Sequence, residues 1–296
     1  MANFPFHYLV GIDGGGTSCR ARICDLAGNI LGEAKTGSAN ILLGSDIAMA
    51  SIQQAIALAA QQAQLTTADY PNMSVGLALA GAEQQQAWHA FMQQSHPYGA
   101  ITLNTDAYGA CLGAWGGKDG AILISGTGSC GILLLDGKQH VVGGREFPIS
   151  DQGSGAVMGL RLIQQVLLSI NGIVPTTELA HHVLTHFEHD IDAIVSWSKT
   201  ARPCDYGQFS PAIFSFAEHN DSLAVSLLQQ TAADIEMWMQ ALILRGANSI
   251  CLMGGIGERI PAWLTPPMQH RLATPQGDAM DGAIAMARGN HNLFVR

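Results

Sequence analysis

The 296-residue sequence has few charged residues, since Asp, Glu, Lys and Arg together make up only 12% of it. Its 14 Lys and Arg are outnumbered by 23 Asp and Glu, which gives a formal net charge of -9. Lys and Arg form no cluster, and binding along a nucleic acid needs a basic face that neutralises phosphates. The composition therefore argues against a nucleic-acid partner.

Long apolar runs and paired cysteines are also missing. No run approaches the roughly 20 apolar residues of a membrane span, and the N-terminal segment MANFPFHYL lacks the basic region of a secretion signal. The six cysteines include no C-x-x-C pair, and most of them lie in apolar stretches. These features favour a cytoplasmic protein with reduced, buried thiols and no membrane partner.

A glycine-rich segment near the N-terminus, VGIDGGGTSCRARI (10–23), follows an apolar run but fits neither of two common phosphate-binding motifs. A Walker A loop needs a lysine where Thr17 stands, and a dinucleotide fingerprint needs a glycine where Cys19 stands. The residues after Ser18 alternate between two faces, which indicates a β-hairpin with the glycines at its bend. Such a loop exposes backbone N–H groups to an anion, although an ordinary glycine-rich turn is the alternative. The expected phosphate contacts are Gly14, Gly15, Gly16, Thr17 and Ser18.

The same pattern returns in AILISGTGSCGILLLDGKQHVVGG (121–144), again as a strand, a Gly/Thr/Ser turn, a second strand and a third. Two similar hairpins, each beginning one half of the chain, predict a duplicated α/β fold whose loops face each other across a cleft. The expected phosphate contacts of the second loop are Gly126, Thr127, Gly128 and Ser129.

Apolar periodicity predicts the order of the elements. Strands are expected near 7–13, 18–25, 30–36, 75–80, 101–105 and 249–255, and helices near 46–64, 106–116, 154–170, 177–187, 189–199, 221–244 and 279–288. We expect one domain over 1–117, which the closing segment 279–296 can join, and a larger one over 118–278. The strand 249–255 ends in glycines, Gly254 and Gly255, which let a flat group such as adenine approach the backbone.

Four segments carry a resemblance to a known superfamily. GIDGGGTS, TDAYGA, ISGTGSCGI and CLMGGIGER follow the order of the phosphate-1, connecting, phosphate-2 and adenosine segments of actin-like ATPases and sugar kinases. Within that superfamily the chain resembles the BadF/BadG/BcrA/BcrD ATPase family, and GSANILLG (37–44) with GGREFPISDQGSGAVMG (143–159) is most similar to its bacterial glucosamine kinases. The likeness spans essentially the whole chain. It implies two ribonuclease-H-like domains with ATP and a sugar bound in the cleft between them.

The resemblance implies an ATP- and Mg²⁺-dependent kinase that phosphorylates the 6-hydroxyl of D-glucosamine. Gly254 and Gly255 would join the two loops in binding ATP. Asp13, at the end of the first strand, would hold Mg²⁺ through water, and a carboxylate that stabilises the turn is the alternative. Asp106 falls on the family's catalytic aspartate, which would orient the acceptor hydroxyl and take its proton; a helix N-cap is the alternative.

The sugar-binding positions of the family fall on Asn40, Asp151 and the backbone of Gly144 and Gly155. The alternatives are a loop residue for Asn40 and a helix cap for Asp151. Arg145 stands where animal N-acetylglucosamine kinases carry a tryptophan, so an apolar wall for an acetyl group is missing. This departure favours glucosamine. Whether Arg145 pairs with an acidic neighbour is left open by the sequence.

Other functions remain open at this point. An N-acetylglucosamine kinase has the most similar chemistry, and a non-enzymatic sugar sensor lacks support because no DNA-binding segment is added. An activator ATPase of a radical dehydratase needs cysteine ligands for a shared iron–sulfur cluster, and no suitable pair occurs. The segment HHVLTHFEH (181–189) could hold zinc through His182 and His186, but a solvated helix face explains it equally well. The sequence does not specify the oligomeric state, and a homodimer is one arrangement that it allows.

Overall fold

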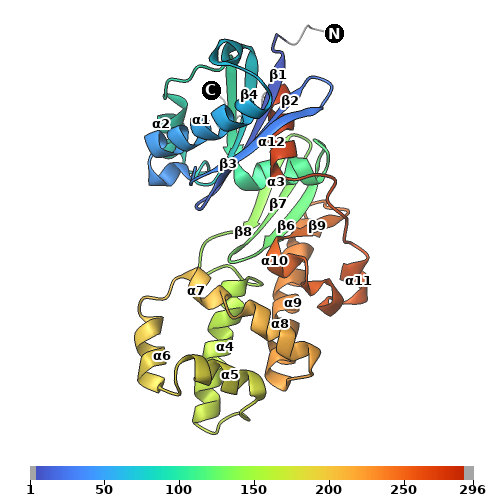
Figure 1. Ribbon diagram of the computed structural model, residues 1–296. Helices are drawn as coiled ribbons and strands as arrows, with labels where there is room; N and C mark the ends of the chain where they lie inside the picture. The colour runs from blue at the N-terminus through green and yellow to red at the C-terminus, as the bar shows by residue number, and fades with distance from the viewer. Residues whose placement is uncertain (1–4, 290–296) are drawn as a thin grey trace. The chain divides into compact units, whose positions relative to one another are not determined.

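The structure, a computed structural model, describes residues 5–289 (Figure 1). The chain divides into two compact units. Unit 1 contains the residues up to Gly120 together with those from Thr274 onward, and unit 2 contains Ala121–Ala273. Within residues 5–289, no helix combines the length and the apolarity that a bilayer crossing needs.

Unit 1 is built on a five-stranded sheet in the order β3-β2-β1-β4-β5. Its strands are β1 (Tyr8–Gly14), β2 (Cys19–Asp25), β3 (Ile30–Thr36), β4 (Met73–Leu79) and β5 (Ala100–Thr105). β2 runs antiparallel to both of its neighbours, β1 and β3, whereas β1, β4 and β5 run parallel to one another. The carboxyl ends of β1, β4 and β5 therefore lie at one edge of the sheet.

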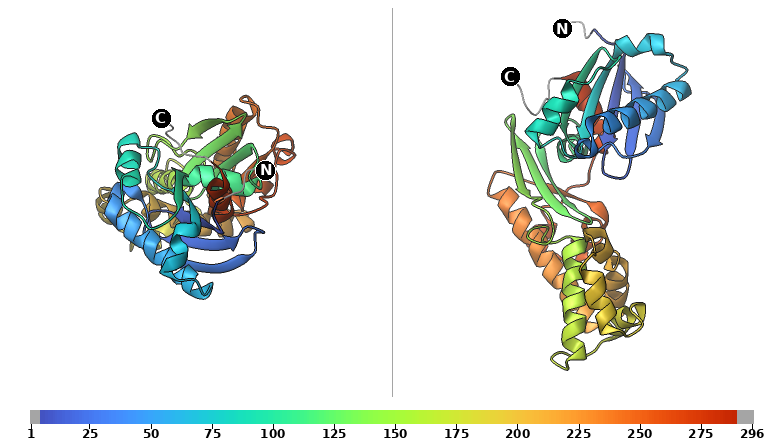
Figure 2. Two further views of the ribbon diagram at one scale, coloured as in Figure 1. Left: turned by 90° about the horizontal axis from the view of Figure 1, so that it is seen from above. Right: turned by 90° about the vertical axis from the view of Figure 1, so that its left-hand side faces the viewer.

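Helices cover both faces of this sheet (Figure 2). They are η1 (Ile41–Leu43), α1 (Ser45–Gln62), η2 (Thr67–Asn72), α2 (Gln85–Met92), α3 (Asp106–Ala114) and α12 (Ala279–Arg288). On β1, Ile12 belongs to one apolar cluster with Ile56 of α1, whereas Leu9, three residues earlier and so on the other face of the strand, belongs to a cluster with Ile284 of α12. Period-2 alternation thus assigns α1 and α12 to opposite faces. A Cβ at Gly76 on β4 would collide with the Ala283 carbonyl of α12, so glycine permits this close approach.

Unit 2 repeats the hairpin arrangement in a four-stranded sheet of order β8-β7-β6-β9. The strands are β6 (Gly120–Ser125), β7 (Ser129–Leu135), β8 (Lys138–Gly143) and β9 (Ile250–Met253). As in unit 1, the first strand of the unit pairs with its hairpin partner on one side and with a parallel strand on the other. The predicted α/β fold with a repeated hairpin is confirmed.

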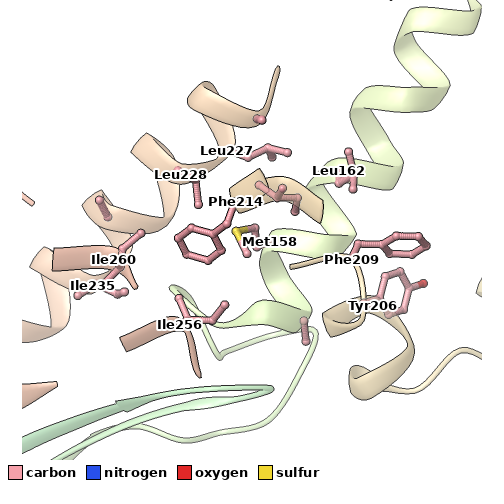
Figure 3. Packing of buried hydrophobic residues seen from close by; sticks show 14 of the residues in the cluster. Met158, Leu162, Tyr206, Phe209, Phe214, Leu227, Leu228, Ile235, Ile256 and Ile260 are labelled. Atoms are coloured by element: carbon pink, nitrogen blue, oxygen red, sulfur yellow. The ribbon is translucent and has the colours of Figure 1, made fainter. Parts of the chain in front are cut away.

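The rest of unit 2 is helical and packs into one large apolar cluster, which includes Phe214, Met158 and Leu228 (Figure 3). The helices are α4 (Gly155–Ile170), α5 (Glu178–His186), α6 (Ile191–Ser198), α7 (Pro203–Gly207), α8 (Ser210–Glu218), α9 (Ser222–Ile243), α10 (Gly254–Gly257), η3 (Ile260–Trp263) and α11 (Pro266–Gln269). The aromatic side chains of Tyr206 and Phe209 fix the connection between α7 and α8 in this cluster.

Candidate active site

The carboxyl edge of the unit 1 sheet collects the residues that the sequence predicts for catalysis. Gly14 of β1 lies beside Leu79 of β4, which lies beside Thr105 of β5. The segment after β3 is tied to the same edge, because Ile41 N donates to the Ala80 carbonyl (3.2 Å). The predicted residues that meet along this edge are Asp13, Gly14, Gly15, Gly16, Thr17, Ser18, Asn40 and Asp106.

The first glycine loop is fixed at its base and open at its apex. The Gly15 carbonyl accepts hydrogen bonds from Ala39 N and Ser38 Oγ, both at 3.1 Å. Gly16 and Thr17 are exposed, and a Cβ placed at Gly16 meets no atom within 4 Å. The apex therefore has room for a bound anion. Asn40 caps η1, because its Oδ1 accepts a hydrogen bond from Leu42 N (2.9 Å). This contact within the loop is what the alternative of a loop residue predicts for Asn40.

Asp13 forms an ion pair that we did not predict from the sequence. Arg20 Nε and Nη2 both donate to Asp13 Oδ2, at 3.0 and 2.6 Å, and Arg20 Nη1 lies 3.5 Å from Asp278 Oδ2. Asp13 and Arg20 are direct cross-strand partners in the β1–β2 register, so the predicted hairpin contained the signal. Within residues 5–289, Asp13 Oδ1 receives no hydrogen bond.

Asp106 is the first residue of α3, and its carboxyl group is partly buried. The alternative that Asp106 is the N-cap is wrong, because Thr105 is the cap and its Oγ1 accepts from Tyr108 N (3.1 Å). Burial raises the pKa of the Asp106 carboxyl, and the negative charges of Glu83 and Asp13 raise it further. The hydrogen bond from Ala107 N (2.8 Å) opposes this shift. Asp106 is thus a stronger proton acceptor than an exposed carboxylate.

The second glycine loop is attached to the N-terminus of α4. The carbonyls of Gly126 and Thr127 accept hydrogen bonds from Gly155 N (2.8 Å) and Ala156 N (3.1 Å). Ser154 caps α4 by accepting from Val157 N, so the alternative that Asp151 is the cap is wrong. The carbonyls of the loop are hydrogen-bonded to the helix, whereas the Thr127 side chain is exposed and accessible to a ligand.

Asp151 is buried beside the second loop, with only 7% of its surface exposed. Its Oδ1 accepts from Ser129 N at 3.3 Å, and Gly144 N donates to the Ser129 carbonyl (3.0 Å). Burial raises the pKa of the Asp151 carboxyl, and the nearby charge of Glu146 raises it further, whereas the Ser129 N–H lowers it. Arg145 is exposed, and within the described part of the chain it pairs with no acidic side chain within 4.0 Å.

A cavity of about 370 Å³ lies within unit 2 next to the second loop. Its wall comes from that loop, the start of α4, the connection from α7 to α8, and α10. The lining residues are Gly126, Thr127, Gly155, Gly207, Ser210, Pro211, Phe214, Gly255, Ile256 and Arg259. Gly254 lies against the loop, since a Cβ there would be 2.6 Å from the Ser125 carbonyl. Gly254 and Gly255, which were expected to let adenine approach the backbone, form the helical turn α10. The part of the wall that comes from α7 and α8 was not predicted.

The histidines of the segment 181–189 are exposed, as the alternative of a solvated helix face predicts. His182 lies 5.4 Å from the ring of Phe216, and His186 contacts the rings of Phe187 and Phe209. In the part of the chain that the structure describes, no group of three His, Cys, Asp or Glu side chains could hold a metal ion. All six cysteines are free, and Cys204 is exposed although we expected buried thiols.

Comparison with known proteins gives consistent matches over the chain. The model of the BadF/BadG/BcrA/BcrD ATPase family matches residues 10–284. The glucosamine kinase GspK of Vibrio cholerae serotype O1 is 65% identical over 97% of this chain and 98% of its own length. A crystal structure from Chromobacterium violaceum, provisionally named N-acetylglucosamine kinase, is 32% identical with a TM-score of 0.86 and covers 96% of this chain and 99% of that one. A ROK family glucokinase of Streptomyces griseus, 17% identical, shares the fold with a TM-score of 0.55 over 95% and 98% of the two chains.

Proposed function

Because the chain belongs to the BadF/BadG/BcrA/BcrD ATPase family, we propose that it transfers a phosphoryl group from ATP to the 6-hydroxyl of D-glucosamine, giving glucosamine 6-phosphate and ADP. The observation that carries this proposal is the 65% identity to a glucosamine kinase over nearly the full length of both chains. The grouping of Asp13, the first glycine loop and Asp106 at one edge of the unit 1 sheet supports it.

Asp106 is the proposed catalytic base. A carboxylate is much too weak to ionise an alcohol before transfer begins, so it orients the 6-hydroxyl and accepts the proton as the new O–P bond forms. Its raised pKa suits this role, because burial and two nearby acids make proton uptake more favourable than at an exposed Asp. The hydrogen bond from Ala107 N fixes one carboxyl oxygen and so orients the group.

The two glycine loops are proposed to hold the phosphates of ATP. Backbone N–H groups and the hydroxyls of Thr17 and Thr127 donate to phosphate oxygens, which replaces the lysine of a Walker A loop. Asp13 fits an Mg²⁺ ion held through water, because its Oδ1 faces no donor in residues 5–289 and the adjoining loop is open. When bound, Mg²⁺ neutralises charge on the transferred phosphate.

The preference for an amino sugar is proposed to come from two acids near the second loop. Burial and the charge of Glu146 disfavour the ionised form of Asp151. A positively charged ammonium group, such as that of glucosamine, would stabilise the two carboxylates. Arg145 is exposed and provides no aromatic wall for an acetyl group. N-acetylglucosamine is the second candidate substrate, because the Chromobacterium violaceum protein provisionally named N-acetylglucosamine kinase is 32% identical to this chain.

An ADP-release assay with glucosamine, N-acetylglucosamine, glucose and mannose tests the proposal. We expect the fastest turnover with glucosamine, and ³¹P NMR of the product should report a phosphomonoester at carbon 6. Turnover without any sugar preference, or phosphorylation at another hydroxyl, would refute it. A cytoplasmic location and a homodimeric assembly stay predictions from the sequence, and light scattering of the purified protein checks the latter.

A further inference from the structure

Helix α9 holds the turn that carries Asp151 through two of its side chains. Asp234 Oδ2 accepts a hydrogen bond from Gly153 N (3.1 Å), and Trp238 Nε1 donates to the Gln152 carbonyl (2.9 Å). Asp234 and Trp238 are four residues apart in α9, so they lie on one face of that helix. The two residues that directly follow Asp151 are thus bonded to the same helix.

The backbone of this turn has a conformation that needs support from its surroundings. Asp151 has a φ of 68°, in the left-handed region, and Gly153 has a φ of 82°. A Cβ at Gly153 would lie 2.8 Å from Ile235 Cγ1, so glycine lets the turn lie directly against α9. Left-handed backbone costs free energy at a residue other than glycine. The contacts around the turn therefore determine where the Asp151 carboxylate lies.

Arg161 of α4 fixes Asp234 in turn. Its Nη1 donates to Asp234 Oδ2 (2.6 Å), and its Nη2 donates to Asp234 Oδ1 (3.3 Å). Both side chains are largely buried, with 28% of Arg161 and 17% of Asp234 exposed. Because a bidentate pair restricts the orientation of a carboxylate, the acceptor for Gly153 N is held in place from a second helix.

Trp238 also contacts the other segment that is proposed to bind the sugar. A Cβ at Gly143 would lie 3.4 Å from Trp238 Cζ2, an ordinary van der Waals contact, so the indole lies against the backbone that leads into Gly144. The Gln152 carbonyl accepts a second hydrogen bond, from Ser129 Oγ (2.8 Å). The half-buried indole of Trp238 therefore links both segments.

We propose that Trp238 and Asp234 are positioning residues for the amino sugar, which act through the turn that carries Asp151. This inference rests on the proposed role of Asp151 in binding glucosamine. The carbonyls of Gly126 and Thr127 in the second glycine loop are held separately, by N–H groups at the start of α4. Trp238 and Asp234 should therefore influence the affinity for the sugar and leave the affinity for nucleotide unchanged.

Calorimetry and steady-state kinetics with glucosamine test the role of Trp238. Trp238→Phe keeps an aromatic ring against Gly143 but loses the donor to Gln152. It should raise both Kd and KM for glucosamine by about three- to tenfold, the effect of one hydrogen bond, while kcat and the Kd for ADP stay unchanged. Trp263→Phe, the same change at a half-buried tryptophan of η3, is the control and should bind glucosamine normally. The thermal midpoint checks that each variant is folded.

A double-mutant cycle with Asp151→Asn separates positioning from a general loss of structure. If Trp238 acts through the Asp151 carboxylate, Trp238→Phe should weaken glucosamine binding in the parent protein but cause no further loss in Asp151→Asn. Equal weakening in both backgrounds, or unchanged glucosamine affinity in Trp238→Phe, would overturn the role of Trp238.

Asp234 gives a second test that leaves Trp238 in place. Asp234→Ala should weaken glucosamine binding, and Asp234→Asn, which keeps an acceptor for Gly153 N, should restore most of the affinity. An Asn variant that binds glucosamine no better than the Ala variant, or equal weakening of ADP and glucosamine, would overturn the role of Asp234. Parent protein that binds no glucosamine would instead refute the proposed function, and this inference with it.

Discussion

The two glycine loops begin similar hairpins but are held in place in different ways. In unit 1 the loop is fixed by donors from the segment after β3, which meet the Gly15 carbonyl. In unit 2 the loop is fixed by the N-terminus of α4, which takes the carbonyls of Gly126 and Thr127.

The polar residue near the end of the first strand also differs between the units. Asp13 precedes the loop of unit 1, whereas Ser125 precedes that of unit 2 and is buried, with its Oγ donating to the Gly153 carbonyl (2.6 Å). The repeated hairpin is therefore a shared scaffold that carries different side chains in the two units. Unit 1 has two carboxylates, Asp13 and Asp106, at its sheet edge, whereas unit 2 has the buried Asp151 and a cavity beside its loop.

Removing the Asp106 carboxylate of unit 1 should have the largest effect on activity. Asp106→Asn is expected to lower kcat by roughly 10²- to 10⁴-fold, because the proton acceptor is lost, while ADP and sugar still bind. Steady-state kinetics and calorimetry check this result. Asp46→Asn, which changes an exposed acid in the first turn of α1, is the matched control.

The same variant has a second, independent readout in stability. A carboxyl whose pKa is raised by folding binds more protons in the folded state, so its contribution to stability falls as the pH rises above the usual carboxyl range. Asn does not ionise, and Asp106→Asn should unfold at the same or a higher temperature near pH 7. A lower midpoint together with lost activity would mean that Asp106 has a structural role.

Removing a donor of unit 2 should affect nucleotide binding alone. Thr127→Val is expected to weaken ATP binding by about 1 to 3 kcal/mol, because one hydrogen bond to a charged phosphate oxygen is lost. Sugar affinity should change little. Thr127→Ser keeps the hydroxyl and is expected to restore most of the affinity; if it binds as poorly as the Val variant, the hydroxyl is not the phosphate contact.

A matched pair of glycine substitutions sharpens the comparison of the loops. A Cβ at Gly16 or at Gly126 meets no protein atom within 4 Å, so alanine at either position should leave the thermal midpoint unchanged. If both loops hold phosphates, each alanine should weaken ATP binding on the order of tenfold, since the methyl group intrudes on the ligand. Normal ATP affinity in one variant would mean that its loop is an ordinary turn.

The smallest expected effect concerns the pH dependence of turnover. Asp106 must be ionised to accept a proton, so kcat should fall on the acidic side of the profile, above the usual carboxyl range. Glu83→Gln removes one of the negative charges that raise the pKa of Asp106 and should move this fall to lower pH. A profile identical to that of the parent protein would exclude an influence of Glu83.

Local sequence patterns predicted the hairpins and the order of elements well, because strand alternation and glycine turns are short-range signals. Long-range packing was less predictable. Ile47, in the first turn of α1, is 57% exposed, whereas Ile52 and Ile56 of the same helix are buried, and its apolar side chain alone does not predict this difference. The position of Asp106 was predicted, whereas its neighbour Thr105 as the cap was not.

The cavity of unit 2 shows the limit most clearly. The motif glycines in its wall were found from the sequence, but Ser210 was not, because it reaches the cavity through the packing of α8 on the core. Nothing in its sequence neighbourhood distinguishes Ser210 from any other residue at the start of a helix. Arg20 differs, since the predicted hairpin register alone would have placed it opposite Asp13.

The most direct test of the proposed chemistry is a comparison of kcat/KM for D-glucosamine and N-acetylglucosamine in one ADP-release assay, because specificity is the ratio of these values. We expect glucosamine to be favoured by at least about tenfold, the effect of roughly 1.4 kcal/mol in transition-state binding. Equal or greater kcat/KM for N-acetylglucosamine would contradict the roles given to Arg145, Glu146 and Asp151.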